Sequence, residues 1–141
     1  MKAKEFIDDM NVVLSSEYAA ILLYIIHSQR LSRQGMTREA NELLFIANDE
    51  IRHAENLARH VRDLGGKPIV ETKWKEGADF LDDMLKTNLE SERKSIVLYK
   101  KLIVLAEKEK FTGIKAALED QLADEVRHSK LLAQLIEKGT L

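Results

Sequence analysis

The hydrophobic residues of this chain recur at steps of three, four and seven positions, the spacing of helices that bury one side. Glycines interrupt the pattern at Gly35 and at the pair Gly65-Gly66, where helices can end. The pattern therefore predicts an all-α fold. Its four predicted helices run from Ala3 to Gln34, from Thr37 to Leu64, from Glu76 to Glu107 and from Thr112 to Lys138, with Thr37 as the cap of the second.

The connections between these helices predict their arrangement. The first two join through Gly35-Met36, and the last two join near Lys110-Phe111, so each pair is expected to be antiparallel. The stretch 65–75 is longer, and at about 3.3 Å per residue it can run along most of a bundle. We therefore predict an antiparallel four-helix bundle with a long crossover between the second and third helices.

One short motif occurs twice in the chain. Asp-Glu-Ile-Arg-His at 49–53 returns 75 residues later as Asp-Glu-Val-Arg-His at 124–128. Each copy contains a Glu-x-x-His. Random placement of 15 Glu and 4 His in 141 residues produces about 0.4 such matches, so two matches indicate a real repeat.

The repeat selects six side chains that interrupt the apolar stripes midway along the predicted helices. Each half supplies a lone Glu, 33 residues ahead of the Glu of its Glu-x-x-His. A Glu and a His three positions apart lie on one helix face, so both can reach a single metal ion. The predicted metal ligands and catalytic residues are Glu17, Glu50, His53, Glu92, Glu125 and His128.

These six residues predict a site for two metal ions inside the bundle. Two helices with Glu-x-x-His and two helices with one Glu can together surround a pair of ions. Four carboxylates balance the charge of two divalent cations. Oxygen and imidazole ligands suit iron, with manganese as an alternative. The midpoint of 17 and 53 is residue 35, and that of 92 and 128 is residue 110, so the ligands of each helix pair are expected at one height.

Five neighbouring residues have alternative interpretations. Tyr24 and Tyr99 each lie seven residues after a predicted ligand Glu. Each is either a core tyrosine or a second shell of the site, as a hydrogen-bond partner of a ligand carboxylate or a redox-active ring. Asp49 and Asp124 are interpreted as solvent or interface charges, with attraction of cations as the alternative. His27 is interpreted as an ordinary polar residue away from the site face.

Other charged residues near the motifs are expected at the surface. Glu90 lies two residues from Glu92 and therefore near the opposite helix face. Arg52 and Arg127 are interpreted as surface residues that form ion pairs.

Composition limits the class of protein. A chain of 141 residues with 45% hydrophobic and 33% charged residues is typical of one soluble globular domain, here 1–141. Its net charge of −2 provides no positive field for nucleic acid or a membrane surface. The absence of Cys excludes disulfides and Cys-ligated metal sites. We expect a cytoplasmic protein, because the longest apolar run, 18–26, is too short to cross a membrane and no signal peptide is evident.

These residues resemble the ferritin-like superfamily, and within it the bacterioferritins most closely. The resemblance runs from Met1 to Lys138 and rests on Glu17 with Tyr24 and His27, on Asp49-Glu50-x-x-His53, on the stretch 84–89 before Glu92, and on Asp124-Glu125-x-x-His128. It implies a ferritin-like bundle that binds two Fe(II) ions and oxidises them with dioxygen or hydrogen peroxide. In the roles that it implies, the irons are bridged by Glu50 and Glu125, and the terminal ligands are Glu17 with His53 and Glu92 with His128.

The sequence departs from this family pattern at two places. Bacterioferritins bind haem through a Met directly after the first bridging Glu, whereas this chain has Ile51 there, so no haem is expected. Their fourth helix is followed by a short fifth helix used in cage assembly, whereas this sequence ends at Leu141, which argues against a 24-subunit cage.

Rubrerythrins resemble this pattern as well, but they carry another carboxylate one turn along the third helix and a Cys-rich iron domain. The residues one turn from Glu92 are Leu89, Ser95 and Ile96, and the chain has no Cys. A complete rubrerythrin is therefore not expected.

Three functions are open at this point. The first is a ferroxidase that stores iron or detoxifies Fe(II) and oxidant as a homo-oligomer, a dimer at least. The second is a small di-iron peroxidase or oxygenase, a rubrerythrin-like redox enzyme that takes electrons from a donor protein. The third is a metal-free helical interaction module, which would be insensitive to chelators. No nucleic-acid or membrane partner is expected.

Overall fold

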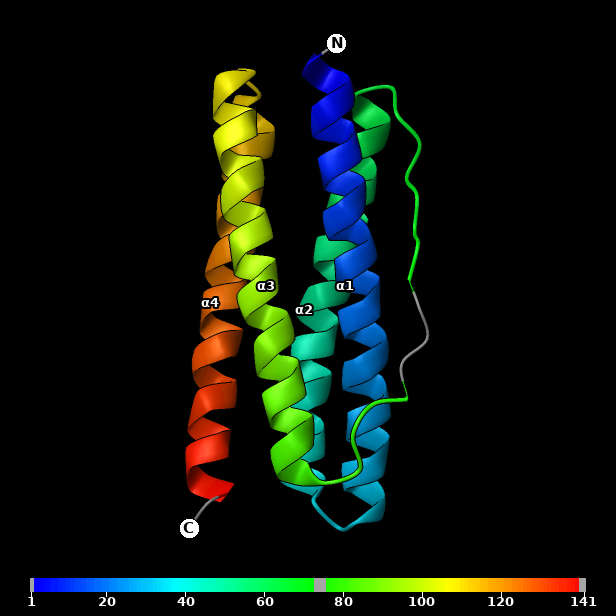
Figure 1. Cartoon of the computed structure of the whole chain (residues 1–141), viewed down its shortest axis with the longest axis vertical. Coiled ribbons are helices and arrows are strands. Elements are labelled where there is room, and N and C mark those ends of the chain that lie inside the picture. Colours follow the sequence, from blue (N-terminus) through cyan, green and yellow to red (C-terminus); the bar gives the residue numbers. More distant parts are fainter. Residues whose placement is uncertain (1, 73–75, 140–141) are drawn as a thin grey trace.

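The protein is a bundle of four long helices, seen here in a computed structural model that describes residues 2–72 and 76–139 (Figure 1). The helices are α1 (Lys2–Arg33), α2 (Thr37–Asp63), α3 (Leu81–Lys108) and α4 (Thr112–Gly139). The predicted all-α fold is therefore confirmed. Residues 73–75 of the predicted crossover lie outside the described part of the chain.

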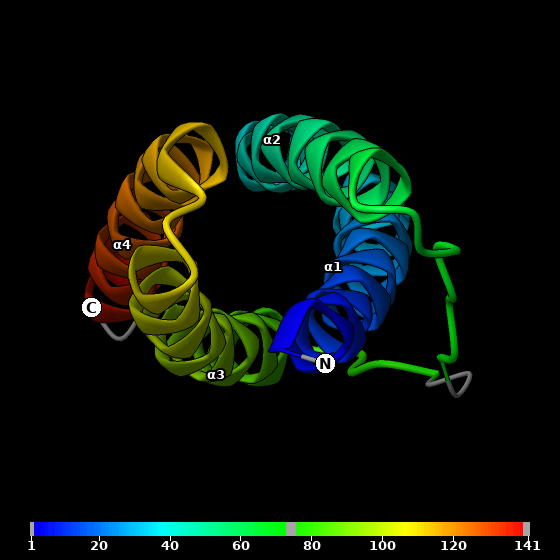
Figure 2. The same ribbon diagram turned by 90° about the horizontal axis from the view of Figure 1, so that it is seen from above.

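The helix directions agree with the predicted topology. α1 and α2 are antiparallel, α3 and α4 are antiparallel, and the crossover returns the chain so that α3 runs parallel to α2 (Figure 1). Seen along the axis, α1 lies beside α2 and α3, and α4 lies beside α3 and α2 (Figure 2). Packing is most extensive within the α1–α2 and α3–α4 pairs and sparsest between α2 and α4. The two sequence halves thus form two helix pairs, which meet along the α1–α3 and α2–α4 seams.

Three helices end in the same kind of backbone turn. The second residue after the helix is left-handed in each turn, at Gly35 (φ 80°), Gly65 (φ 85°) and Lys110 (φ 63°). In each turn the next amide donates a 2.9 Å hydrogen bond to the carbonyl five residues earlier, as Met36 does to Leu31. Lys110 lies 75 residues after Gly35, so both stand at the same position of the repeat.

The start of α2 differs from the prediction. Met36 is the cap residue instead of Thr37, and it makes no side-chain cap hydrogen bond. Its carbonyl accepts a 3.0 Å hydrogen bond from the Ala40 amide, while its own amide is bound by α1. Backbone groups of the tight turn, and not a threonine side chain, therefore satisfy this helix start.

The start of α3 also differs from the prediction. The helix begins at Leu81, so the predicted start at Glu76 was wrong. Gly77 is left-handed, with φ 80°, which interrupts a helix. The amide of Ala78 donates to Nε2 of His27 on α1 at 3.1 Å and is not part of a helical ladder. The crossover is therefore longer than predicted because α1 binds its last residues.

The first part of the crossover is bound to α1 as well. The Asn11 side chain donates to the Lys67 carbonyl at 3.1 Å and accepts from the Ile69 amide at 2.9 Å. One turn along α1, the Ser15 hydroxyl accepts from the Glu71 amide at 2.9 Å. The described parts of the crossover therefore follow the outer side of α1 (Figure 1).

The apolar core consists of two clusters, and each draws on all four helices. One cluster includes Phe6, Met10, Leu14, Leu57, Leu102 and Leu118. The other includes Leu31, Leu43, Ile46, Met84, Leu85 and Leu132. Along every helix, the predicted metal ligands fall between these two sets. The polar site is therefore a layer with apolar packing above and below it.

Helix α1 is more apolar than its short run of hydrophobic residues suggested. Among the described residues it is the one helix, over Ala3–Arg33, that is long and apolar enough to cross a membrane. Within the apolar window, however, 56% is buried inside the bundle. The core helix of a bundle meets the same criteria of length and composition, so this observation is weak evidence for a membrane.

The turn at Lys110 leads to a prediction about stability. Lys110→Gly should raise the free energy of unfolding of the metal-free protein by about 1 kcal/mol, because a side chain in the left-handed region is strained. Urea unfolding monitored by circular dichroism measures the change. The matched substitution Gly35→Lys should lower the free energy of unfolding by a similar amount. A destabilised Lys110→Gly protein would contradict the prediction.

Candidate metal centre

The six side chains predicted to bind metal lie in one buried layer of the bundle. They come from all four helices: Glu17 from α1, Glu50 and His53 from α2, Glu92 from α3, and Glu125 and His128 from α4. None of the six is more than 2% exposed. The helical repeat places them there because each lies on the inward stripe, where apolar residues precede and follow it.

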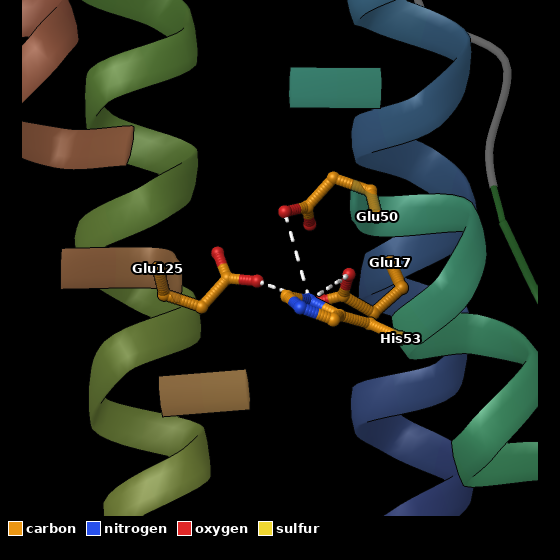
Figure 3. Close-up of side chains that lie close together, drawn as sticks. All are labelled: Glu17, Glu50, His53 and Glu125. Carbon is orange, nitrogen blue, oxygen red and sulfur yellow. Dashed lines mark hydrogen bonds and ion pairs between the residues drawn. The ribbon is translucent and has the colours of Figure 1, made fainter. Parts of the chain in front are cut away.

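The ligands of each helix pair face one another, as the midpoint of the repeat predicts. Glu17 Oε2 lies 3.5 Å from His53 Nδ1, and Glu92 Oε1 lies 3.6 Å from His128 Nδ1. Glu125 reaches across from α4 to the His53 ring, with its Oε1 2.9 Å from His53 Nδ1 (Figure 3). The two imidazole rings are 6.4 Å apart between centroids.

Two overlapping groups of side chains could each hold one metal ion. Their donor atoms lie within 4.8 Å of one another in both groups. The first group is Glu17, Glu50, His53 and Glu125, and the second is Glu50, Glu92, Glu125 and His128. Glu50 and Glu125 belong to both groups, which is the arrangement of bridging ligands between two ions.

The hydrogen bonding of the carboxylates is incomplete. Both oxygens of Glu17 and of Glu50 are buried without a hydrogen-bond partner, as are Oε2 of Glu92 and Oε2 of Glu125. A buried carboxylate without a partner is strongly unfavourable unless it is protonated or neutralised by a cation. These oxygens converge on the site, so the residues fit a pair of divalent cations.

Burial dominates the electrostatics of the carboxyl groups. It raises the pKa of Glu17 and of Glu50 well above the ordinary value, and the surrounding carboxylates add to the effect. Burial, together with the nearby carboxyl group of Glu125, raises the pKa of Glu92 to about 8. Burial likewise raises the pKa of Glu125. Without metal, the site therefore retains protons at neutral pH.

The two imidazoles are shifted in the direction that favours protonation. Burial alone would lower the pKa of His53, but hydrogen bonds to Glu125 and Asp124 and the charge of Glu50 raise it. For His128, the neighbouring carboxylates of Glu50 and Glu92 outweigh burial and raise the pKa to about 11. Imidazolium groups thus take the place of cations among the carboxylates of the metal-free protein.

Asp49 and Asp124 have a role that their interpretation as solvent or interface charges missed. Nε2 of His53 lies 2.7 Å from Asp124 Oδ2, and Nε2 of His128 lies 2.8 Å from Asp49 Oδ2. Each Asp therefore binds the histidine of the other half of the chain. A carboxylate on the remote ring nitrogen fixes the imidazole so that its other nitrogen faces the metal position.

The arginines of the two motifs complete these contacts across the α2–α4 seam. Arg52 donates to Asp124 Oδ2 at 2.9 Å, and Arg127 lies 3.5 Å from Asp49 Oδ2. Hydrogen bonds from His53 and Arg127 outweigh burial and lower the pKa of Asp124, which therefore stays ionised. The expected ion pairing of both arginines is confirmed, and every charged residue of the repeated motif has a partner in the other half. The repeated Asp and Arg were the sequence signal for this arrangement.

The two tyrosines are buried beside the carboxylates in unequal settings. The Tyr24 hydroxyl donates a short 2.5 Å hydrogen bond to Glu92 Oε1. The Tyr99 hydroxyl accepts a 2.9 Å hydrogen bond from Gln121, a buried residue that sequence reasoning did not single out. Residue 46, at the matching position of the first half, is Ile, so the two halves differ here.

Other residues near the motifs fall into two classes. The Glu90 side chain is 70% exposed, as predicted from its helix face. His27, interpreted as an ordinary polar residue away from the site face, belongs to neither group of possible metal ligands, but it is completely buried. It is off the metal layer but lies in the α1–α3 seam, where it hydrogen bonds to Asn88.

Comparison with known proteins agrees with this architecture. The model of the ferritin-like domain matches residues 7–141. The bacterial ferritin of Neisseria meningitidis serogroup B is 33% identical over 130 residues, which cover 91% of this chain and 84% of the relative. The bacterial ferritin of Pseudomonas aeruginosa is 31% identical over 131 residues, covering 92% and 85%.

A solved structure is similar over almost its whole length. It is a ferritin-like, di-iron carboxylate protein from Bacillus anthracis, with a TM-score of 0.84 and 30% identity. The match covers 96% of this chain and 98% of that one. On the family match, the sequence identities and the shared fold, this chain is a member of the ferritin-like family.

Proposed function

We propose that this protein binds two Fe(II) ions in the buried layer and oxidises them with dioxygen or hydrogen peroxide. The observation that carries the proposal is the pair of overlapping four-residue groups, which share Glu50 and Glu125 and have unpartnered buried oxygens. Oxygen and imidazole donors suit iron, and the same donors accept manganese. Similarity to bacterial ferritins and to a di-iron carboxylate protein supports iron over manganese.

In this proposal the ligands take the roles that their positions favour. Glu50 and Glu125 bridge the two ions, because both are within reach of both positions. The terminal ligands are Glu17 with His53 for one ion and Glu92 with His128 for the other. Asp124 and Asp49 hold the two rings from behind, and the Tyr24 hydroxyl orients Glu92.

The chain's own groups also control the protons. Fe(II) binds to deprotonated carboxylates and neutral imidazoles, so its binding releases the protons that the metal-free site retains. The bound irons supply the electrons that reduce the oxidant. Apolar clusters on both sides of the layer keep bulk water from the site, which strengthens the attraction between cations and carboxylates.

The second candidate is a small di-iron peroxidase or oxygenase supplied with electrons by a donor protein. The buried hydroxyls of Tyr24 and Tyr99 beside the carboxylates favour it, because tyrosines can pass protons and electrons. Native mass and iron capacity separate the two candidates. A hollow oligomer that holds many irons per chain supports storage, whereas a dimer that holds two and requires a reductant supports the redox enzyme. For either activity we propose the cytoplasm, since a chain without Cys suits a reducing compartment.

The ligand assignment predicts the loss of iron oxidation in single variants. Glu125→Ala or His128→Ala should abolish the near-ultraviolet absorbance that develops when Fe(II) is added to the wild-type protein in air, because each change removes a donor from the site. Stopped-flow absorbance measures the effect. Glu119→Ala changes an exposed Glu of the same helix and should react like wild type. A full signal from Glu125→Ala or His128→Ala would refute the assignment.

The shifted pKa values predict how pH affects the metal-free protein. Glu92, with its pKa raised to about 8, stabilises the fold fully below its unfolded value near 4.5, and this stability is lost as pH rises towards 8. The raised pKa of His128, about 11, adds a loss that begins above its unfolded value near 6.5. The melting temperature of the metal-free protein should therefore fall between pH 6 and pH 8.

Metal should reverse this trend, because it binds the deprotonated groups. The increase in melting temperature caused by Mn(II) should be larger at pH 8 than at pH 6, measured by calorimetry in both buffers. Glu50→Gln removes a buried carboxyl group that is unfavourable to ionise, so the metal-free variant should lose less stability than wild type as the pH rises, and it should lose most of the response to Mn(II). A metal-free wild type that melts higher at pH 8 than at pH 6 would contradict the sign of these shifts.

A further inference from the structure

One buried histidine outside the metal layer joins three segments of the chain. His27 and Asn88 are both 0% exposed, and His27 Nδ1 lies 2.7 Å from Asn88 Oδ1 on α3. On the other side of the ring, Nε2 accepts a 3.1 Å hydrogen bond from the Ala78 amide of the crossover. A single imidazole on α1 therefore contacts α3 and the crossover together.

These two contacts determine the form of the ring. The Ala78 amide can only donate, so Nε2 of His27 is the acceptor and Nδ1 carries the proton. Nδ1 then donates to the amide oxygen of Asn88. Burial lowers the pKa of His27, which favours the same neutral form. Both nitrogens of the ring are thus satisfied by specific partners.

The crossover is packed tightly against this ring. Two further polar side chains at the end of α1 bind the same segment, since Arg30 donates to the Ala78 carbonyl at 2.9 Å and Gln34 donates to the Asp79 carbonyl at 2.8 Å. Gly77 lies so close that an added Cβ would be 2.8 Å from His27 Nε2. The fit therefore depends on the absence of a side chain at residue 77.

The contact between His27 and Asn88 adjoins the metal layer. Three residues before His27, Tyr24 donates its 2.5 Å hydrogen bond to Glu92. Asn88 lies one turn before Glu92 on α3, so the two contacts are successive links across the α1–α3 seam. The hydrogen bond between His27 and Asn88 thereby sets the position, along the α1–α3 seam, of the α3 turn that carries Glu92.

The equivalent positions of the repeat show that the α1–α3 seam does not need a polar pair at this level. A shift of 75 residues places Leu102 where His27 stands and Val13 where Asn88 stands. Both are 1% exposed and belong to the apolar core. The polar pair therefore occurs at the end of the α1–α3 seam where Ala78 of the crossover contacts α1, and not at the other end of that seam.

We propose that His27 is a positioning residue of the metal centre, which latches the crossover onto the α1–α3 seam and, through Asn88, holds the turn of α3 that presents Glu92. The link to Glu92 rests on the proposed metal-binding function. The latching of the crossover does not depend on it.

The double variant His27→Leu/Asn88→Val tests the latch by introducing the apolar residues that stand at the equivalent positions of the repeat, Leu102 and Val13. It removes both hydrogen bonds and leaves the partly buried Ala78 amide of the crossover without its acceptor, while the residues within the bundle core become apolar, so the bundle should fold. We expect hydrogen exchange of the Ala78 amide to become at least about tenfold faster, because its acceptor is lost. In anaerobic titrations with Co(II), the second ion should bind about 10–100-fold more weakly, while the first binds as in wild type.

Gly77→Ala tests the same proposal from the crossover side. It leaves the bundle residues unchanged but forces the crossover away from His27, so the exchange of Ala78 and the binding of the second Co(II) should change in the same directions. Gly65→Ala is the matched control, because Gly65 has the same left-handed backbone, with φ 85°, and its added Cβ would meet nothing within 4 Å. This control should leave both measurements at wild-type values.

The outcomes separate the latch from the metal site. Faster exchange of Ala78 with unchanged Co(II) binding would reduce His27 to an anchor of the crossover and overturn its positioning role. Unchanged exchange in both variants would overturn the latch itself. A wild-type protein that binds no Co(II) would refute the metal site and with it the role of Glu92, while the exchange of Ala78 would still decide whether the crossover is latched.

Discussion

The burial of four carboxylates at the centre of a helical bundle is the constraint on which this structure depends. Charged groups without partners in an apolar interior are strongly unfavourable, so the site must contain protons or cations. The raised pKa values of Glu17, Glu50 and Glu125 show the first solution, in which protons are retained. The convergence of their unpartnered oxygens favours the second, in which two divalent ions replace the protons.

The repeated motif solves this problem by pairing the two halves of the chain across the α2–α4 seam. Packing between these two helices is the sparsest in the bundle, yet the hydrogen bonds that join them, between His53 and Asp124 and between His128 and Asp49, are among the shortest. The Asp of each motif binds the His of the other motif and lies close to the Arg of that other motif. One short sequence thus supplies the metal ligands, the groups that orient them and the contact that joins two helix pairs.

Much of this arrangement could be predicted from the sequence. The period of 75 residues selected six side chains that the structure brings together, and the helical spacing and the loop lengths predicted the bundle and its crossover. The repeated Asp was a signal that Asp49 and Asp124 matter, but their partners could not be predicted, because a repeat shows which positions are equivalent in the two halves and not which side chains meet. The predicted start of α3 was wrong because Ala78 contacts α1, which is distant in sequence, and this contact overrides the local helical pattern.

His27 illustrates the same limit. Its position off the site stripe suggested an ordinary polar residue, but a helix in a bundle has two buried sides, and His27 lies on the side that faces α3 and the crossover. The repeat nevertheless contains a signal that His27 is buried, because Leu102, an apolar residue, stands at the equivalent position. A polar residue that replaces a core residue at one of two equivalent positions marks a feature that the other position lacks, here the contact with the Ala78 amide.

The most direct test of the central claim is anomalous diffraction from crystals grown metal-free and soaked anaerobically with Fe(II). The account predicts two iron peaks per chain in the buried layer, with Glu50 and Glu125 bound to both, one peak beside His53 and the other beside His128. A single peak, or irons bound only at the protein surface, would contradict it.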